Sequence, residues 1–80
     1  MEPVFEIDQR VKVVHDMLGD YFLGSEGVIK DITYKEKENE FVYGLVVIKP
    51  GKNLSMYNET TIYYFVQGEL ELARENDYEV

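Results

Sequence analysis

Short segments in which apolar and polar residues alternate predict a chain built from β-strands. The clearest begins at Arg10, where Val11 and Val13 fall on one face together with His15. The polar face of the same segment carries Arg10 and Lys12. We therefore expect a first strand over residues 10–15, with one face against a core.

Four further segments have the β-branched and aromatic composition of strands. They cover residues 27–34, 41–48, 60–66 and 69–72. The segment 41–48 is apolar on both faces, which suits a central strand or a strand whose outer face meets a partner, and Gly44 within it predicts a bulge or a tight bend. The charged residues 35–40 predict a solvated hairpin turn. The pattern therefore favours an all-β domain.

Two longer connections complete the predicted organisation. The first, residues 16–25, is unusually apolar for a loop and is followed by the turn Gly24-x-x-Gly27 and the β-branched pair Val28-Ile29. This glycine turn lacks the lysine, the serine and the following helix of a phosphate-binding loop, which excludes that interpretation. The second connection follows Pro50-Gly51.

Three motifs resemble SH3-like barrels of the KOW type. The run Phe5-Glu6-Ile7-Asp8-Gln9-Arg10-Val11-Lys12-Val13 is similar to their opening Φ-x-Φ-G-D-x-V-x-V, although Asp8-Gln9-Arg10 stands where Gly-Asp-x is usual. The second motif is the glycine turn with its following strand. The third is the ending Val66-Gln67-Gly68-Glu69-Leu70-Glu71-Leu72. Signalling SH3 domains match less well, because the chain has no tryptophan and no A-L-Y-D-Y run.

This resemblance implies a small five-stranded SH3-like barrel with a short 3₁₀ turn before the last strand. The length of 80 residues predicts a single domain over residues 1–80. The resemblance covers residues 5–72, which we expect to hold the core, and residues 73–80 form an acidic tail. Members of this broad class are non-catalytic and work by contact. Bacterial and phage members are typically small accessory or partner-binding proteins.

The charge balance changes the expected partner. Sixteen acidic and eight basic residues give a net charge of −8, which argues against direct nucleic-acid binding, because that requires lysine and arginine to neutralise phosphates. No apolar run approaches the length of about 20 residues that spans a bilayer, and the N-terminus lacks the features of a signal peptide. We therefore expect a cytoplasmic protein that does not bind membranes.

Acidic residues gather toward the chain ends, and they suggest an acidic patch. Its predicted members are Glu69, Glu71, Glu75, Asp77 and Glu79. Such a patch either keeps the protein soluble or mimics nucleic acid and blocks a basic binding site. A weak KOW-like nucleic-acid contact is a further alternative. It would use Arg10, Lys12, Lys30, Lys49 and Lys52.

The sequence offers no complete catalytic constellation. His15 is the only histidine, and nothing in the spacing supplies it with an orienting carboxylate or brings it to Ser25 or Ser55. Cysteine is absent, which removes thiolate chemistry and disulfides, and no acidic loop carries the glycine bend of a calcium site. We expect no enzymatic activity, no cofactor and no metal.

Apolar residues in the two long connections are the predicted partner-binding site. They are Met17, Leu18, Tyr21, Phe22, Leu23, Leu54, Met56 and Tyr57. In SH3-like barrels these two loops border the usual binding groove, and acids around apolar anchors suit a partner with a basic or apolar surface. Alternatively, these side chains cap the open end of a small barrel. Either arrangement is compatible with a monomer or a weak homodimer.

Overall fold

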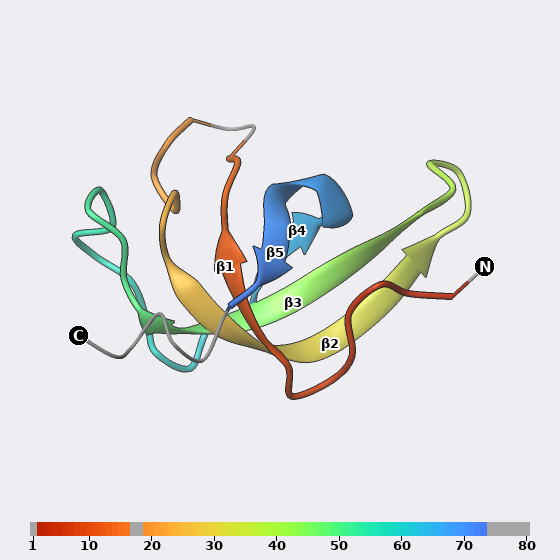
Figure 1. Cartoon of the computed structure of the whole chain (residues 1–80), viewed down its shortest axis with the longest axis horizontal. Coiled ribbons are helices and arrows are strands. Elements are labelled where there is room, and N and C mark those ends of the chain that lie inside the picture. Colours follow the sequence, from red (N-terminus) through yellow and green to blue (C-terminus); the bar gives the residue numbers. More distant parts are fainter. Residues whose placement is uncertain (1, 17–18, 74–80) are drawn as a thin grey trace.

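Five antiparallel strands form one sheet in a computed structural model that describes residues 2–16 and 19–73 (Figure 1). The elements are β1 (Arg10–Val13), β2 (Glu26–Lys35), β3 (Glu40–Lys49), β4 (Tyr63–Val66), the 3₁₀ turn η1 (Gln67–Glu69) and β5 (Leu70–Leu72). Their order across the sheet is β4-β3-β2-β1-β5. The predicted all-β class and the 3₁₀ turn before the last strand are confirmed.

The two edges of this sheet are β4 and β5. Within the described residues no ladder joins them, and η1 carries the chain from one edge to the other. The sheet is strongly curved, and β2 and β3 form a long hairpin that extends away from the other strands (Figure 1). The architecture of the described residues is therefore a curved, open five-stranded sheet.

The predicted alternation of the first strand is confirmed over Arg10–Val13 but not beyond it. Val11 and Val13 are buried, whereas His15 is exposed and lies outside β1. The expected position of His15 beside the two valines is therefore wrong. The reason is a change of partner: the backbone N–H groups of Val14 and His15 donate to the Glu69 carbonyl at 2.8 and 3.3 Å. These bonds draw the chain toward η1.

The fourth strand is shorter than the predicted segment 60–66. Asn58 holds the preceding residues in a turn, since its side-chain Oδ1 accepts the Thr60 N–H at 2.8 Å and its carbonyl accepts the Thr61 N–H at 3.1 Å. These local bonds compete with strand pairing, as asparagine side chains commonly do. Strand pairing therefore begins only at Tyr63.

The irregularity predicted at Gly44 occurs on the partner strand. Ile29 pairs with Leu45 and Asp31 with Gly44, so Lys30 is the additional residue. The bulge therefore belongs to β2 and lies opposite the glycine. It bends the long hairpin at its middle.

The core is organised around Tyr43, the largest fully buried side chain. Its hydroxyl accepts the backbone N–H of Val4 at 2.9 Å, and its ring meets Phe5 edge-on with centroids 5.1 Å apart. These contacts fix the N-terminal segment against the centre of β3. Phe22 and Tyr63, both partly buried, pack against the same core cluster.

The first long loop (residues 14–25) and the second (residues 50–62) pack on each other. The Gly51 N–H donates to the buried Ser25 hydroxyl oxygen at 2.8 Å. The Asn53 side-chain amide donates to the Asp20 carbonyl at 3.0 Å, and the Tyr21 hydroxyl donates to the Met56 carbonyl at 2.6 Å. The described parts of these loops thus form one layer at one end of the sheet.

The contact at Gly51 gives the first prediction. A methyl group there would overlap the Leu23 carbonyl oxygen and lie 2.9 Å from the Ser25 backbone nitrogen, so Gly51→Ala forces the loops apart. We expect it to lower the free energy of unfolding by about 1–3 kcal/mol, measured by urea denaturation. Gly68→Ala is the matched control, because a methyl group at Gly68 meets nothing within 4 Å. Equal stability of the two variants would contradict the described packing of the loops.

Candidate functional site

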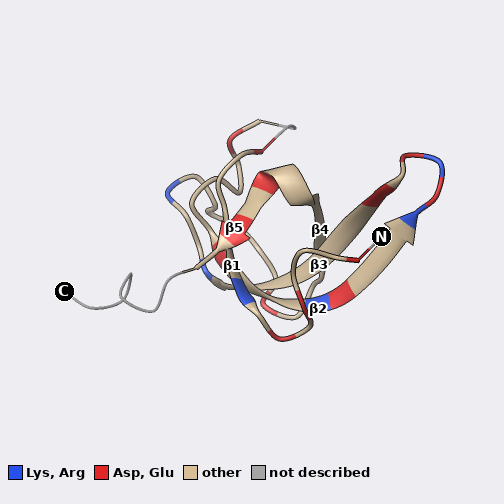
Figure 2. Ribbon diagram, turned by 45° about the vertical axis from the view of Figure 1, so that its right-hand side comes forward, with Lys and Arg blue, Asp and Glu red and all other residues tan. Residues whose placement is uncertain are grey.

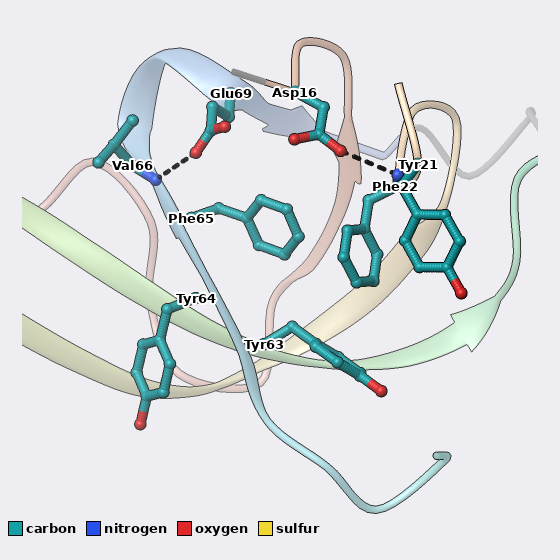
Figure 3. Close-up of a pocket in the computed structure, with 8 residues that line it drawn as sticks. All are labelled: Asp16, Tyr21, Phe22, Tyr63, Tyr64, Phe65, Val66 and Glu69. Atoms are coloured by element: carbon teal, nitrogen blue, oxygen red, sulfur yellow. Dashed lines mark hydrogen bonds between the residues drawn. The ribbon is translucent and has the colours of Figure 1, made fainter. Parts of the chain in front are cut away.

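A groove of about 630 Å³ lies between β4 and the first long loop (Figure 3). Its lining residues are Asp16, Tyr21, Phe22, Tyr63, Tyr64, Phe65, Val66 and Glu69. We call this the β4 groove. Its lining combines aromatic rings with two carboxylates, and no lysine, arginine or histidine is among the described lining residues.

The two carboxylates of the β4 groove are held by backbone donors. Asp16 Oδ2 accepts the Phe22 N–H at 2.9 Å, and Glu69 Oε1 accepts the Val66 N–H at 3.0 Å (Figure 3). Each residue is only 8 % exposed. Hydrogen bonds to a charged acceptor are stronger than neutral ones, so both negative charges have fixed positions on the groove wall.

Phe22 joins the groove to the hydrophobic core. Its ring centroid lies 4.9 Å from that of Tyr63 and 5.4 Å from that of Phe65, and the Tyr21 ring meets it edge-on at 5.1 Å. The loop therefore packs against β4 through aromatic contacts. This packing gives the groove a firm aromatic wall, because moving the loop would disrupt the core cluster.

Tyr64 points to the other face of the sheet and crosses β3 at Gly44. A methyl group on Gly44 would lie 2.9 Å from Tyr64 Cε1, so the absence of a side chain there makes room for the ring. The Tyr64 hydroxyl donates to Asp31 Oδ2 at 3.0 Å. This hydrogen bond, with smaller contributions from desolvation and the negative charge of Asp31, raises the pKa of Tyr64 above its ordinary value of 10.0.

The hydrogen bond between Tyr64 and Asp31 predicts that removing the Asp31 charge changes the pKa of the Tyr64 hydroxyl. Deprotonation of Tyr64 would break its hydrogen bond to Asp31 and place two negative charges side by side. The hydrogen bond therefore stabilises the fold below the ordinary pKa of tyrosine, and this stabilisation is lost as pH rises through the raised pKa of Tyr64 in the folded protein. We expect Asp31→Asn to lower the pKa of Tyr64 toward 10.0. The tyrosinate absorbance, read as a difference from Tyr64→Phe, measures it.

Asp20→Asn is the control for this titration, since Asp20 is exposed and its recorded hydrogen bonds use its backbone carbonyl. It should leave the pKa of Tyr64 unchanged. An unchanged pKa in Asp31→Asn as well would show that Asp31 does not act on the hydroxyl.

The predicted partner-binding residues are divided among several environments. Tyr21 and Phe22 line the β4 groove, and Leu23 and Met56 are exposed. Tyr57 lies in a separate hollow with Val47, Ile48 and Glu59. Leu54 is only 5 % exposed and packs inside the protein. Met17 and Leu18 lie outside the described residues.

The predicted acidic patch does not form one surface in the described part of the chain. Glu69 is buried in the β4 groove, whereas Glu71 is exposed on β5. Acidic positions are spread over several loops and strands, with basic positions between them (Figure 2). The other members of the patch, Glu75, Asp77 and Glu79, lie outside the described residues.

Two of the five basic residues proposed to contact nucleic acid form ion pairs with carboxylates. Arg10 pairs with Glu26 at 3.0 Å, and Lys30 pairs with Asp8 at 3.0 Å. The Glu26 side chain is only 4 % exposed. Glu26 and Asp8 therefore offset the positive charges of Arg10 and Lys30, which would otherwise be available to a phosphate group.

The sequence did not predict that Asp16, Glu69 and the residues of β4 form one site. One signal was available for Glu69, because a glutamate three residues after the start of a helical turn commonly accepts the N–H group there. Val66 and Glu69 have that spacing. The burial of Asp16 had no local signal, since it depends on the loop folding back onto β4.

Of the candidate nucleophiles, Ser25 occupies a structural position, whereas Ser55 is exposed. Ser25 is 1 % exposed, and its hydroxyl oxygen accepts the Gly51 N–H. Over residues 2–16 and 19–73, the structure gathers no set of three or more potential metal ligands. Nor does this part of the chain contain a helix of the length and hydrophobicity required to cross a membrane.

Comparison with known proteins finds no matching family model, no matching curated protein and no matching solved structure. The geometry and charge of the β4 groove are therefore the guide to function.

Proposed function

We propose that the chain is a non-catalytic protein-binding module, an SH3-like barrel that docks on a larger protein assembly. Its β4 groove receives a cationic, extended segment of the partner. The observation that carries this proposal is the combination of five aromatic residues and two fixed carboxylates in one groove, with no basic residue among its described lining.

Charge complementarity supports a cationic partner. Lysine and arginine are attracted both to carboxylates and to the faces of aromatic rings, and both attractions strengthen where water is partly excluded. Asp16 and Glu69 provide the carboxylates, while Tyr21 provides an exposed ring beside them. The net charge of −8 adds a long-range attraction that favours rapid encounter with a basic surface.

The order of elements supports the SH3-like assignment. The 3₁₀ turn after the fourth strand, which leads into a short closing strand, is the feature that the sequence motifs implied. The structure adds the pairing of this closing strand with the first strand. The β4 groove lies between that loop and that turn. In SH3-like barrels the first long loop borders the usual binding groove, so the position of the groove agrees with a docking role.

The other proposals have less support. Nucleic-acid mimicry depends mainly on acids at positions 75–79, which lie outside the described residues. Direct nucleic-acid contact would use Arg10, Lys12, Lys30, Lys49 and Lys52. Two of these, Arg10 and Lys30, are paired with Glu26 and Asp8. The protein-binding proposal uses only groups that the structure brings together.

A synthetic peptide of alternating lysine and valine tests the proposed function. The double substitution Asp16→Asn and Glu69→Gln removes both groove charges, while the amide oxygens can still accept the Phe22 and Val66 N–H groups. We expect it to weaken peptide binding by about tenfold or more. Binding is measured by titration followed by nuclear magnetic resonance.

The matched control is Glu36→Gln with Glu38→Gln, which changes the net charge by the same amount at exposed positions of the hairpin turn. It should leave the affinity within about threefold of the parent, because exposed charges away from the groove are screened by salt. Equal weakening by both pairs would mean that net charge alone attracts the peptide. That result, or an absence of binding to the parent protein, would refute the proposed groove.

A further inference from the structure

We propose that the partner segment binds as an additional β-strand on the outer edge of β4. This inference rests on the proposed function above and specifies how the β4 groove recognises its partner: through backbone hydrogen bonds as well as through charge.

The direction of one hydrogen bond reveals the free edge. β4 pairs with β3 in the register Gly44↔Tyr64 and Val42↔Val66. The Val66 N–H donates to Glu69 Oε1, so it points away from β3. In an antiparallel pair, alternate residues direct both backbone groups toward the same side. The N–H and C=O of Tyr64 therefore point outward as well.

Within residues 2–16 and 19–73, no backbone group pairs with the outer edge at Tyr64, whereas the N–H of Val66 is capped by Glu69. Among the described residues, Tyr64 donates and accepts no backbone bond outside the strand ladder. An incoming strand would therefore pair at Tyr64 and end before Val66. The Glu69 carboxylate thus defines one end of the added ladder.

The β4 groove runs beside this edge. All four residues of β4 line it, and Asp16, Tyr21 and Phe22 of the first loop form the opposite wall. The three residues of β4 before Val66 extend roughly 10 Å, which matches an extended segment of about three residues. Alternate side chains of such a segment would face the two carboxylates.

Charge identifies the occupant as a basic segment of another protein. Each copy of this chain carries a net charge of −8, so a second copy would be repelled. A segment with lysine or arginine at alternate positions would instead be attracted by the two carboxylates. Strand addition gives affinity through the main chain and specificity through alternate side chains.

N-methylated peptides test this mode of binding. The probe is the hexapeptide Lys-Val-Lys-Val-Lys-Val, made unmodified, methylated at the backbone nitrogens of its lysines, or methylated at those of its valines. In an added strand only one set of nitrogens faces β4. We therefore expect one methylated peptide to lose about tenfold or more in affinity and the other to remain within about threefold of the parent.

Hydrogen exchange gives a second readout. Saturation with the unmodified peptide should slow exchange of the Tyr64 amide by about tenfold or more, because that amide gains a partner. Equal binding of the two methylated peptides, or equal loss, would overturn strand addition. If the unmodified peptide still depends on Asp16 and Glu69 in that case, the proposed function stands without it.

Two further outcomes would also overturn the inference. Failure of the unmodified peptide to bind would overturn the proposed function and strand addition together. Protection of the Tyr64 amide that rises with protein concentration in the absence of peptide would identify a second copy of the chain, rather than a basic partner, as the occupant of the edge.

Discussion

Two hydrogen bonds from backbone N–H groups to carboxylates determine the shape of the β4 groove. The bond from Phe22 to Asp16 folds the first loop back on itself, and the bond from Val66 to Glu69 turns the chain out of β4 into η1. The turn at η1 then directs β5 to its position beside β1. The same contacts that end β4 and order the loop therefore fix two negative charges in the lining of one groove.

Much of the strand pattern could be predicted from the sequence, because alternating apolar and polar residues indicate which face of a strand is buried. Val11 and Val13 are buried as expected, and the charged turn after β2 is exposed. The errors arise where tertiary contacts override local pattern. His15 lies outside β1 because its N–H donates a hydrogen bond to the Glu69 carbonyl. Leu54 is buried because the two long loops pack together.

The candidate site was only partly predictable. The apolar character of the first loop identified Tyr21 and Phe22, but a charged residue in an acidic sequence is expected to face water. Asp16, Glu26 and Glu69 are all buried. Each is stabilised by a backbone donor or an arginine, and these partners are distant or conformation-dependent. Such burial is therefore a property of the fold rather than of the local sequence.

The central claim is that a partner occupies the β4 groove. Isotope-filtered nuclear Overhauser spectroscopy on the complex with the lysine–valine peptide locates the bound segment most directly. The account predicts contacts from the peptide to the rings of Tyr21 and Phe22 and to the backbone of Tyr64. Contacts confined to Tyr57, or to the hairpin turn at residues 36–39, would contradict it.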